Sequence, residues 1–135
     1  MLNTVEDQQP PQHPPATVLL VEDDEVVRRL TQMILEDTGY RVLSAEDGTQ
    51  AARLNRSFKG EIDLLLSDVM LPGGNGVEWA QRLKQDRPAM SALFMSAYSR
   101  DALRDEGVPD PGSHLLRKPV RPALLIQTIR EILNR

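Results

Sequence analysis

The chain has 135 residues, a formal net charge of −4 at pH 7 and no cysteine. This length suits one domain with its own core, and the absence of cysteine excludes a disulfide framework, a thiolate zinc site and a cysteine nucleophile. The basic residues are scattered, which argues against direct nucleic-acid binding. Because no apolar run approaches the roughly 18 to 20 residues that cross a bilayer, and no signal peptide is recognisable, we expect a cytoplasmic protein without membrane insertion.

Residues 1–16 differ in composition from the rest of the chain. Four prolines occur there among Gln, Asp and Glu, and such a composition favours extended, solvated conformations over packing. We therefore expect a proline-rich disordered tail or linker over 1–16 and a folded domain over 17–135.

In the first half of the domain, short apolar runs alternate with helical patterns. The continuous run at 17–21 predicts a strand covered on both faces. A helix that ends at Gly39 follows, then a strand at 41–45, a helix at 48–58 and a strand at 62–67. Apolar residues recur in the first helix at spacings of three and four: Val26, Val27, Leu30, Met33, Ile34 and Leu35. In the second helix Ala51, Ala52 and Leu54 are expected to face inward.

The second half begins with a segment, 71–76, whose proline and three glycines predict an irregular loop. We expect a helix at 77–86, a strand at 92–95, a short strand around Leu115 and Leu116, and a final helix at 122–133 with Pro122 in its first turn. Between the last two strands, prolines and glycines from 107 to 112 restrict the fourth helix to about 99–106.

Strict alternation of strands and helices predicts an α/β fold with a five-stranded parallel sheet and helices on both faces. Ligands of such sheets bind beyond the carboxyl ends of the strands. Polar residues follow three of the predicted strands at that edge.

The first of these groups suggests a metal site. Glu22 and Asp23 would meet Asp68 at the sheet edge, and clustered carboxylates need a cation to neutralise them. Mg²⁺ is the expected ion, because it prefers oxygen ligands and commonly joins carboxylates to a phosphate. In the alternative reading, Glu22, Asp23 and Asp24 only cap the next helix.

Asp68 is also a candidate nucleophile. A carboxylate at the rim of the core can attack phosphorus and carry an acyl phosphate. Phosphoryl transfer needs mainly positioning and charge neutralisation, which the Lys118 ammonium and the Ser96 hydroxyl can supply. Taken singly, Lys118 and Ser96 are ordinary surface and strand-end residues, but together with the acids they indicate a phosphate site.

Four motifs resemble the receiver domain of two-component response regulators, in its order and close to its spacing: Leu20-Val-Glu-Asp-Asp24, Leu66-Ser-Asp-Val-Met-Leu-Pro72, Phe94-Met-Ser-Ala97 and Leu116-Arg-Lys-Pro119. The resemblance covers Thr17 to about Leu133 and implies a flavodoxin-like, receiver-type fold. It implies that Asp68 is the phosphoacceptor, that Ser96 is the switch hydroxyl and that Lys118 contacts the phosphate. For the metal it implies Asp23 as a direct ligand, Glu22 acting through water, and the Met70 backbone carbonyl as a further ligand. It also suggests a cis Lys118–Pro119 bond.

The sequence departs from this family at two places that concern output. Leu115 occupies the position where receiver domains usually carry an aromatic switch residue, so that switch is absent. The short, proline-broken fourth helix resembles receivers attached to hybrid sensor kinases.

We therefore expect a phosphoacceptor in a phosphorelay, whose partner is a histidine kinase or a histidine phosphotransfer protein, and which forms part of a longer hybrid kinase or acts alone. It would not be an enzyme, although it would assist its own phosphorylation and dephosphorylation. Two alternatives remain at this point: a degenerate receiver that only binds a partner, and a Mg²⁺-dependent aspartyl phosphatase of the haloacid dehalogenase type. A flavodoxin-type flavin module would share the fold, but the carboxylates after the first strand would repel the flavin phosphate.

Overall fold

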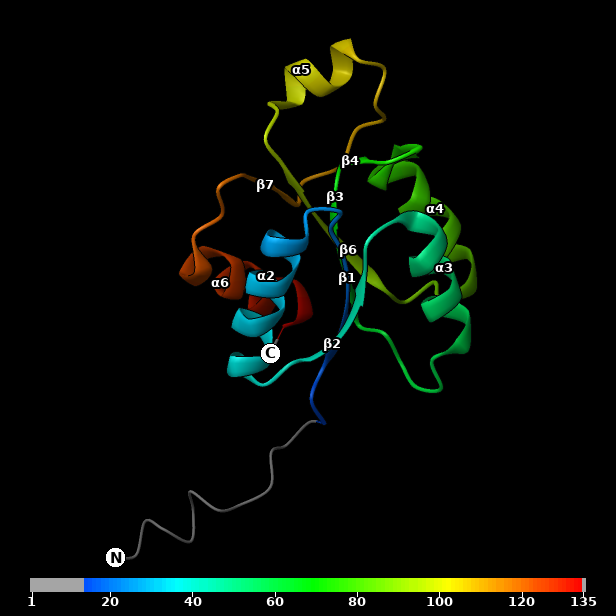
Figure 1. Ribbon diagram of the computed structural model, residues 1–135, viewed down its shortest axis with the longest axis vertical. Coiled ribbons are helices and arrows are strands. Elements are labelled where there is room, and N and C mark those ends of the chain that lie inside the picture. Colours follow the sequence, from blue (N-terminus) through cyan, green and yellow to red (C-terminus); the bar gives the residue numbers. More distant parts are fainter. Residues whose placement is uncertain (1–13, 135) are drawn as a thin grey trace, which may run out of the picture.

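The structure, a computed structural model, describes residues 14–134 and contains a five-stranded parallel sheet (Figure 1). The strand order is β2-β1-β3-β6-β7. The strands are β1 (Thr17–Val21), β2 (Arg41–Ala45), β3 (Leu64–Asp68), β6 (Ser91–Ser96) and β7 (Leu115–Arg117). This confirms the predicted sheet. Most of the tail predicted for 1–16 lies outside the described residues.

Helices cover both faces of the sheet. In Figure 1, α2 (Glu25–Thr38) and α6 (Pro122–Leu133) lie on one face, while α3 (Gly48–Ser57) and α4 (Gly76–Asp86) lie on the other. The short helix α5 (Arg100–Asp105) projects beyond the carboxyl ends of the strands. None of the helices within 14–134 is both long enough and apolar enough to span a membrane.

Two apolar layers, one on each face, hold the helices to the sheet. In β1, Val18 and Leu20 pack with α2 and α6, whereas Leu19 and Val21 pack with α3 and α4. All four are almost inaccessible to solvent. This alternation within a continuous apolar run is what a strand buried on both faces requires.

Side-chain caps fix where four of the helices begin. Asp24, Asp47, Asn75 and Ser99 each accept a hydrogen bond from the backbone N–H three residues later. Such caps satisfy amide groups that have no partner within the helix. The alternative in which the acids after β1 cap the next helix is therefore right for Asp24, whose Oδ1 accepts from the Val27 N–H at 3.0 Å.

The irregular loop predicted for 71–76 is wrong in part. Met70–Leu71 (β4) pairs antiparallel with Gly74–Asn75 (β5), and only Pro72 and Gly73 form the turn. Proline presets φ at the first central position, and Gly73 adopts φ +76° at the second, which is the turn geometry that glycine permits. The hairpin directly follows Asp68 and thus shapes the edge of the site.

In helix α2, the apolar residues that recur at spacings of three and four do not all face the core. Thr31 and Leu35 are buried against the sheet, whereas Val26, Leu30 and Met33 are more than half exposed. The apolar residues of this helix occupy more than one stripe, and a helix turns only one stripe to the sheet. In α3 the prediction is confirmed, because Ala51 is buried and Ala52 and Leu54 pack against the core.

Candidate functional site

The register of the sheet brings the polar residues of distant segments to one edge. Val21 lies opposite Ser67, and Ser96 lies opposite Arg117, so the residues that follow β1 and β7 reach the level of Asp68. The strand order also changes direction between β1 and β3, because β2 lies on one side of β1 and β3 lies on the other. This is the position where sheets of this type form a ligand crevice.

The Lys118 ammonium lies between two buried carboxylates. Its Nζ donates to Glu22 Oε1 at 2.6 Å and lies 2.7 Å from Asp68 Oδ1. Glu22 and Asp68 are 1% and 4% exposed, while Asp23 is exposed. The Asp68 Oδ1 contact with Lys118 is an ion pair without hydrogen-bond alignment, and this buried oxygen has no aligned donor.

The charges of this group are unbalanced, because two buried acids share one base. Burial, together with the neighbouring Glu22, raises the pKa of Asp68 to about 8 despite the presence of Lys118. Burial also acts to raise the pKa of Glu22, but hydrogen bonds from protonated Asp68 and from Lys118 outweigh it and lower that pKa. For Lys118, burial is outweighed by the two carboxylates, and its pKa is raised. Without a further cation, the site thus favours the protonated form of Asp68 well above the ordinary pKa of a carboxyl.

These residues fit a divalent cation. Glu22, Asp23 and Asp68 each offer one carboxylate oxygen, and the three oxygens lie within 4.8 Å of one another. Hard oxygen ligands of this kind suit Mg²⁺, and a cation would replace the proton on Asp68. The acidic cluster is typical of the Mg²⁺ site of receiver domains. The Met70 carbonyl as a ligand stays a prediction.

Ser96 and Lys118 meet Asp68 at one small hollow of about 120 Å³. Ser96 is the last residue of β6 and is 4% exposed, and its carbonyl accepts from the Lys118 N–H at 2.8 Å. The Lys118–Pro119 bond is cis, as the resemblance implied. Two predicted metal ligands, Asp23 and Met70, also line the hollow. The other lining residues, which the sequence analysis did not predict as site residues, are Met95, Ala97 and Tyr98.

Arg28 is a further residue of the site that the sequence analysis did not identify. Its Nη1 donates to the Glu22 carbonyl at 2.8 Å and to the Asp23 carbonyl at 3.5 Å, and so fixes the backbone of the acidic segment. The sequence did carry a signal for Arg28. A basic residue in the first turns of a helix is repelled by the positive end of the helix dipole, so its presence there indicates that it has acceptors of its own.

Gly76 keeps the segment after Asp68 close to the end of β3. Its N–H donates to the Val69 carbonyl at 2.6 Å, and a Cβ on residue 76 would overlap the Asp68 carbonyl oxygen. We expect Gly76→Ala to lower the free energy of unfolding by about 1–3 kcal/mol, because backbone must shift to admit the methyl group. Urea denaturation measures this.

Gly74→Ala is the matched control for that substitution. A Cβ there would meet only Trp79 Nε1 at an ordinary 3.7 Å. Its free energy of unfolding should stay within about 0.5 kcal/mol of wild type. Equal losses in the two variants would contradict the crowding assigned to Gly76.

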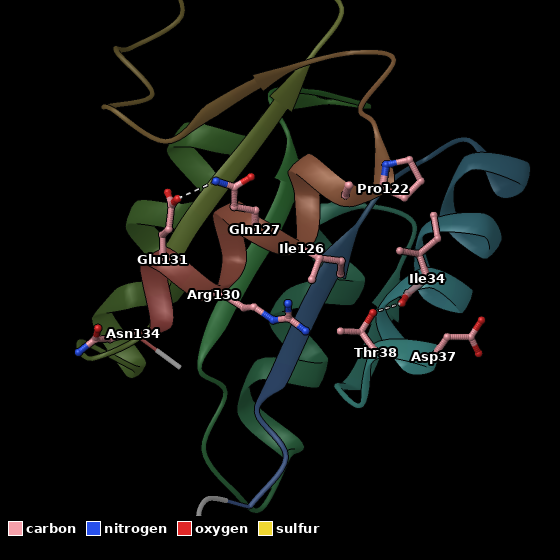
Figure 2. A pocket seen from close by; sticks show the side chains of 10 residues that line it. Ile34, Asp37, Thr38, Pro122, Ile126, Gln127, Arg130, Glu131 and Asn134 are labelled. Atoms are coloured by element: carbon pink, nitrogen blue, oxygen red, sulfur yellow. Dashed lines mark hydrogen bonds between the residues drawn. The ribbon is translucent and has the colours of Figure 1, made fainter.

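A larger hollow than the one at Asp68, about 860 Å³, lies along α2 and α6 (Figure 2). Ile34 and Ile126 are among its apolar lining residues. At its rim Gln127 bonds Glu131 at 3.3 Å, as Figure 2 shows. Glu22, Asp23 and Asp68 do not line this hollow.

Comparison with known proteins agrees with this geometry. The family model of the response regulator receiver domain matches residues 18–130. The chain is 33% identical over 101 residues to the sensor kinase CckA of Brucella abortus (strain 2308). The aligned segment covers 75% of this chain and 11% of that kinase. It spans less than half the length of the curated relatives it matches first.

Two solved structures are similar over most of this chain. The receiver domain of the hybrid histidine kinase CckA has a TM-score of 0.74 and 30% identity, covering 87% of this chain and 99% of its own. The CheY-like receiver domain protein from Methanospirillum hungatei JF-1 has a TM-score of 0.77 and 26% identity, covering 89% and 94%. Together with the acidic pocket, these matches show that the chain belongs to the response regulator receiver domain family.

Proposed function

We propose that this receiver, residues 17–135, takes a phosphoryl group from a phosphohistidine onto Asp68 with Mg²⁺ bound by Glu22, Asp23, Asp68 and the Met70 carbonyl. The observation that carries the proposal is the position of Asp68, buried at the carboxyl end of β3 with Lys118 Nζ 2.7 Å from its Oδ1. A carboxylate in that position is both a nucleophile and a metal ligand.

The transfer would proceed by in-line displacement. A carboxylate oxygen of Asp68 attacks phosphorus, and the bond from phosphorus to the imidazole nitrogen breaks. The imidazole, which carries a proton on its other ring nitrogen, leaves as the neutral ring with the electron pair of the broken bond. Lys118 already lies beside Asp68 and would pair with an oxygen of the transferred group. Bound Mg²⁺ would supply further positive charge to the phosphoryl oxygens.

Ser96 would sense the transferred group. Its oxygen accepts a hydrogen bond from the Tyr98 N–H at 2.9 Å, which leaves its own hydrogen available to a phosphoryl oxygen. A hydroxyl that turns toward the phosphoryl group would alter the segment that leads from β6 into α5. The change in conformation is thus expected at 96–100.

A receiver domain implies a histidine kinase as its partner. The sensor kinase CckA is similar to this chain along one segment of its length. We infer that the phosphoryl donor is a histidine kinase or a histidine phosphotransfer protein, and that the chain serves within or beside a hybrid kinase. It would assist its own phosphorylation and dephosphorylation without acting on a separate substrate.

Incubation with acetyl phosphate, monitored by intact mass, tests this function. With millimolar Mg²⁺ the protein should gain one phosphoryl group. With a chelator it should gain none, because no cation then displaces the proton of Asp68 or offsets the charge of the incoming phosphoryl oxygens. A folded protein that gains nothing under either condition would refute the proposal. Steady turnover of many phosphomonoesters would instead support the phosphatase alternative.

A further inference from the structure

Two hydrogen bonds hold the peptide group that joins Ala97 to Tyr98. Its carbonyl, which belongs to Ala97, accepts from Arg117 Nη2 at 3.0 Å. Its N–H, which belongs to Tyr98, donates to Ser96 Oγ at 2.9 Å. Because a peptide group is planar and rigid, its carbonyl and its N–H move together. The Ser96 hydroxyl and the Arg117 guanidinium are therefore linked through one peptide group.

The residues at the two ends of this link are fixed by the sheet, whereas the peptide group is not. Ser96 and Arg117 are paired residues of β6 and β7, and the Ser96 carbonyl accepts from the Lys118 N–H at 2.8 Å. The peptide group lies in the segment 97–99, which connects β6 to α5. In β7, with the sequence Leu-Leu-Arg, Arg117 supplies the one polar side chain. The connecting segment can thus move while both strands stay in place.

The strand order gives the direction of such a movement. Asp68 belongs to β3 and Arg117 to β7, and β6 lies between these two strands. A Ser96 hydroxyl that turns toward a phosphoryl group on Asp68 therefore turns away from β7. The Tyr98 N–H is part-buried and would lose its acceptor if the peptide group stayed behind, which is costly. The peptide group thus follows the hydroxyl, and its carbonyl moves away from Arg117.

We propose that Arg117 is a positioning residue that holds the segment 97–99 in its unphosphorylated arrangement and so opposes the turn of Ser96 toward the phosphoryl group. This rests on the proposed function of Asp68 as phosphoacceptor. A hydrogen bond that is stronger before the turn than after it favours the unphosphorylated state. By linkage, the same bond lowers the affinity of the site for a phosphoryl group, and its loss raises that affinity.

Arg117→Met tests this inference, because methionine keeps an aliphatic side chain but has no hydrogen-bond donor. The probe is beryllium fluoride, an analogue of the phosphoryl group, titrated at saturating Mg²⁺ and followed by backbone amide NMR signals. We expect the dissociation constant to fall about threefold, since the bond is exposed and water can replace it. Loss of a positive charge alone would raise the dissociation constant, because it weakens the attraction for an anion.

Two further proteins separate the hydrogen bond from other effects. Arg121→Met makes the same change at an exposed arginine before α6 whose side chain forms no cap hydrogen bond, and its dissociation constant should not fall below that of wild type. In a Ser96→Ala background there is no hydroxyl to draw the peptide group. Adding Arg117→Met to that background should therefore leave the dissociation constant unchanged.

The outcomes also distinguish this inference from the proposed function. If Arg117→Met binds beryllium fluoride no more tightly than wild type, the inference is refuted and the phosphoacceptor function stands. Equal tightening in Arg121→Met, or in the Ser96→Ala background, refutes it as well, because the effect would then not pass through the bond to Ser96. If wild type gains no phosphoryl group from acetyl phosphate, the proposed function fails and this inference fails with it.

Discussion

Replacing Asp68 with asparagine is expected to abolish the gain of a phosphoryl group from acetyl phosphate. The amide has no negative charge and is a poor nucleophile, and Lys118, which lies 2.7 Å from Asp68 Oδ1, would lose the charge it pairs with. Loss of a nucleophile typically lowers reactivity on the order of a thousandfold or more, so no labelled protein should be visible by intact mass.

Asp24→Asn is the matched control for this substitution. Asp24 is an exposed neighbour in the acidic segment that caps α2, and asparagine caps helices about as well as aspartate. This variant should be labelled like wild type. If the Asp68→Asn protein gains a phosphoryl group at the wild-type rate, the acceptor is another residue and the assignment is wrong.

The position of Asp68 could be predicted because it depends on features that sequence carries directly. A short apolar run between turn signals indicates a buried strand, and parallel strands end at the same edge. The register, with Val21 opposite Ser67, then brings Glu22 to the level of Asp68. The acids thus follow from the strand pattern alone, without knowledge of any helix orientation.

Features that depend on packing could not be predicted in the same way. Periodicity identified α2 as a helix, but Val26 and Leu30 are exposed while Thr31 is buried, because packing against the sheet selects one stripe of several. The β4–β5 hairpin has only two residues in each strand, too few to show alternation around the Pro72–Gly73 turn. A backbone carbonyl ligand such as that of Met70 leaves no mark in residue type, and only the family resemblance suggests it.

Without divalent cations, the free energy of unfolding is expected to fall as pH rises from 5 to 8. The Asp68 carboxyl titrates at its ordinary value of 3.8 when unfolded, whereas burial and Glu22 raise its pKa to about 8 in the folded protein. Between these values the folded state binds the extra proton, so stability is greatest at low pH and is lost as pH rises through the folded value. The slope from this one group approaches about 1.4 kcal/mol per pH unit.

The lower limit of pH 5 keeps Glu22 out of the measurement. The pKa of Glu22 is lowered from 4.5, so its contribution is present above that value and is lost only as pH falls below it. The raised pKa of Lys118 likewise concerns pH values above 10.5. Within the chosen window, Asp68 is the member of the cluster whose protonation differs between the folded and unfolded states.

Urea denaturation of wild type and Asp68→Asn, with and without millimolar Mg²⁺, isolates this contribution. The asparagine variant should lack the wild-type decline, since residue 68 then carries no proton to lose. The difference between the two proteins removes the titrating groups that do not contact residue 68. Mg²⁺ should restore the wild type most at pH 8, because the cation then neutralises the ionised Asp68 that Lys118 alone leaves uncompensated. Parallel pH profiles for the two metal-free proteins would show that Asp68 is already ionised beside Glu22, and would refute the raised pKa assigned to Asp68.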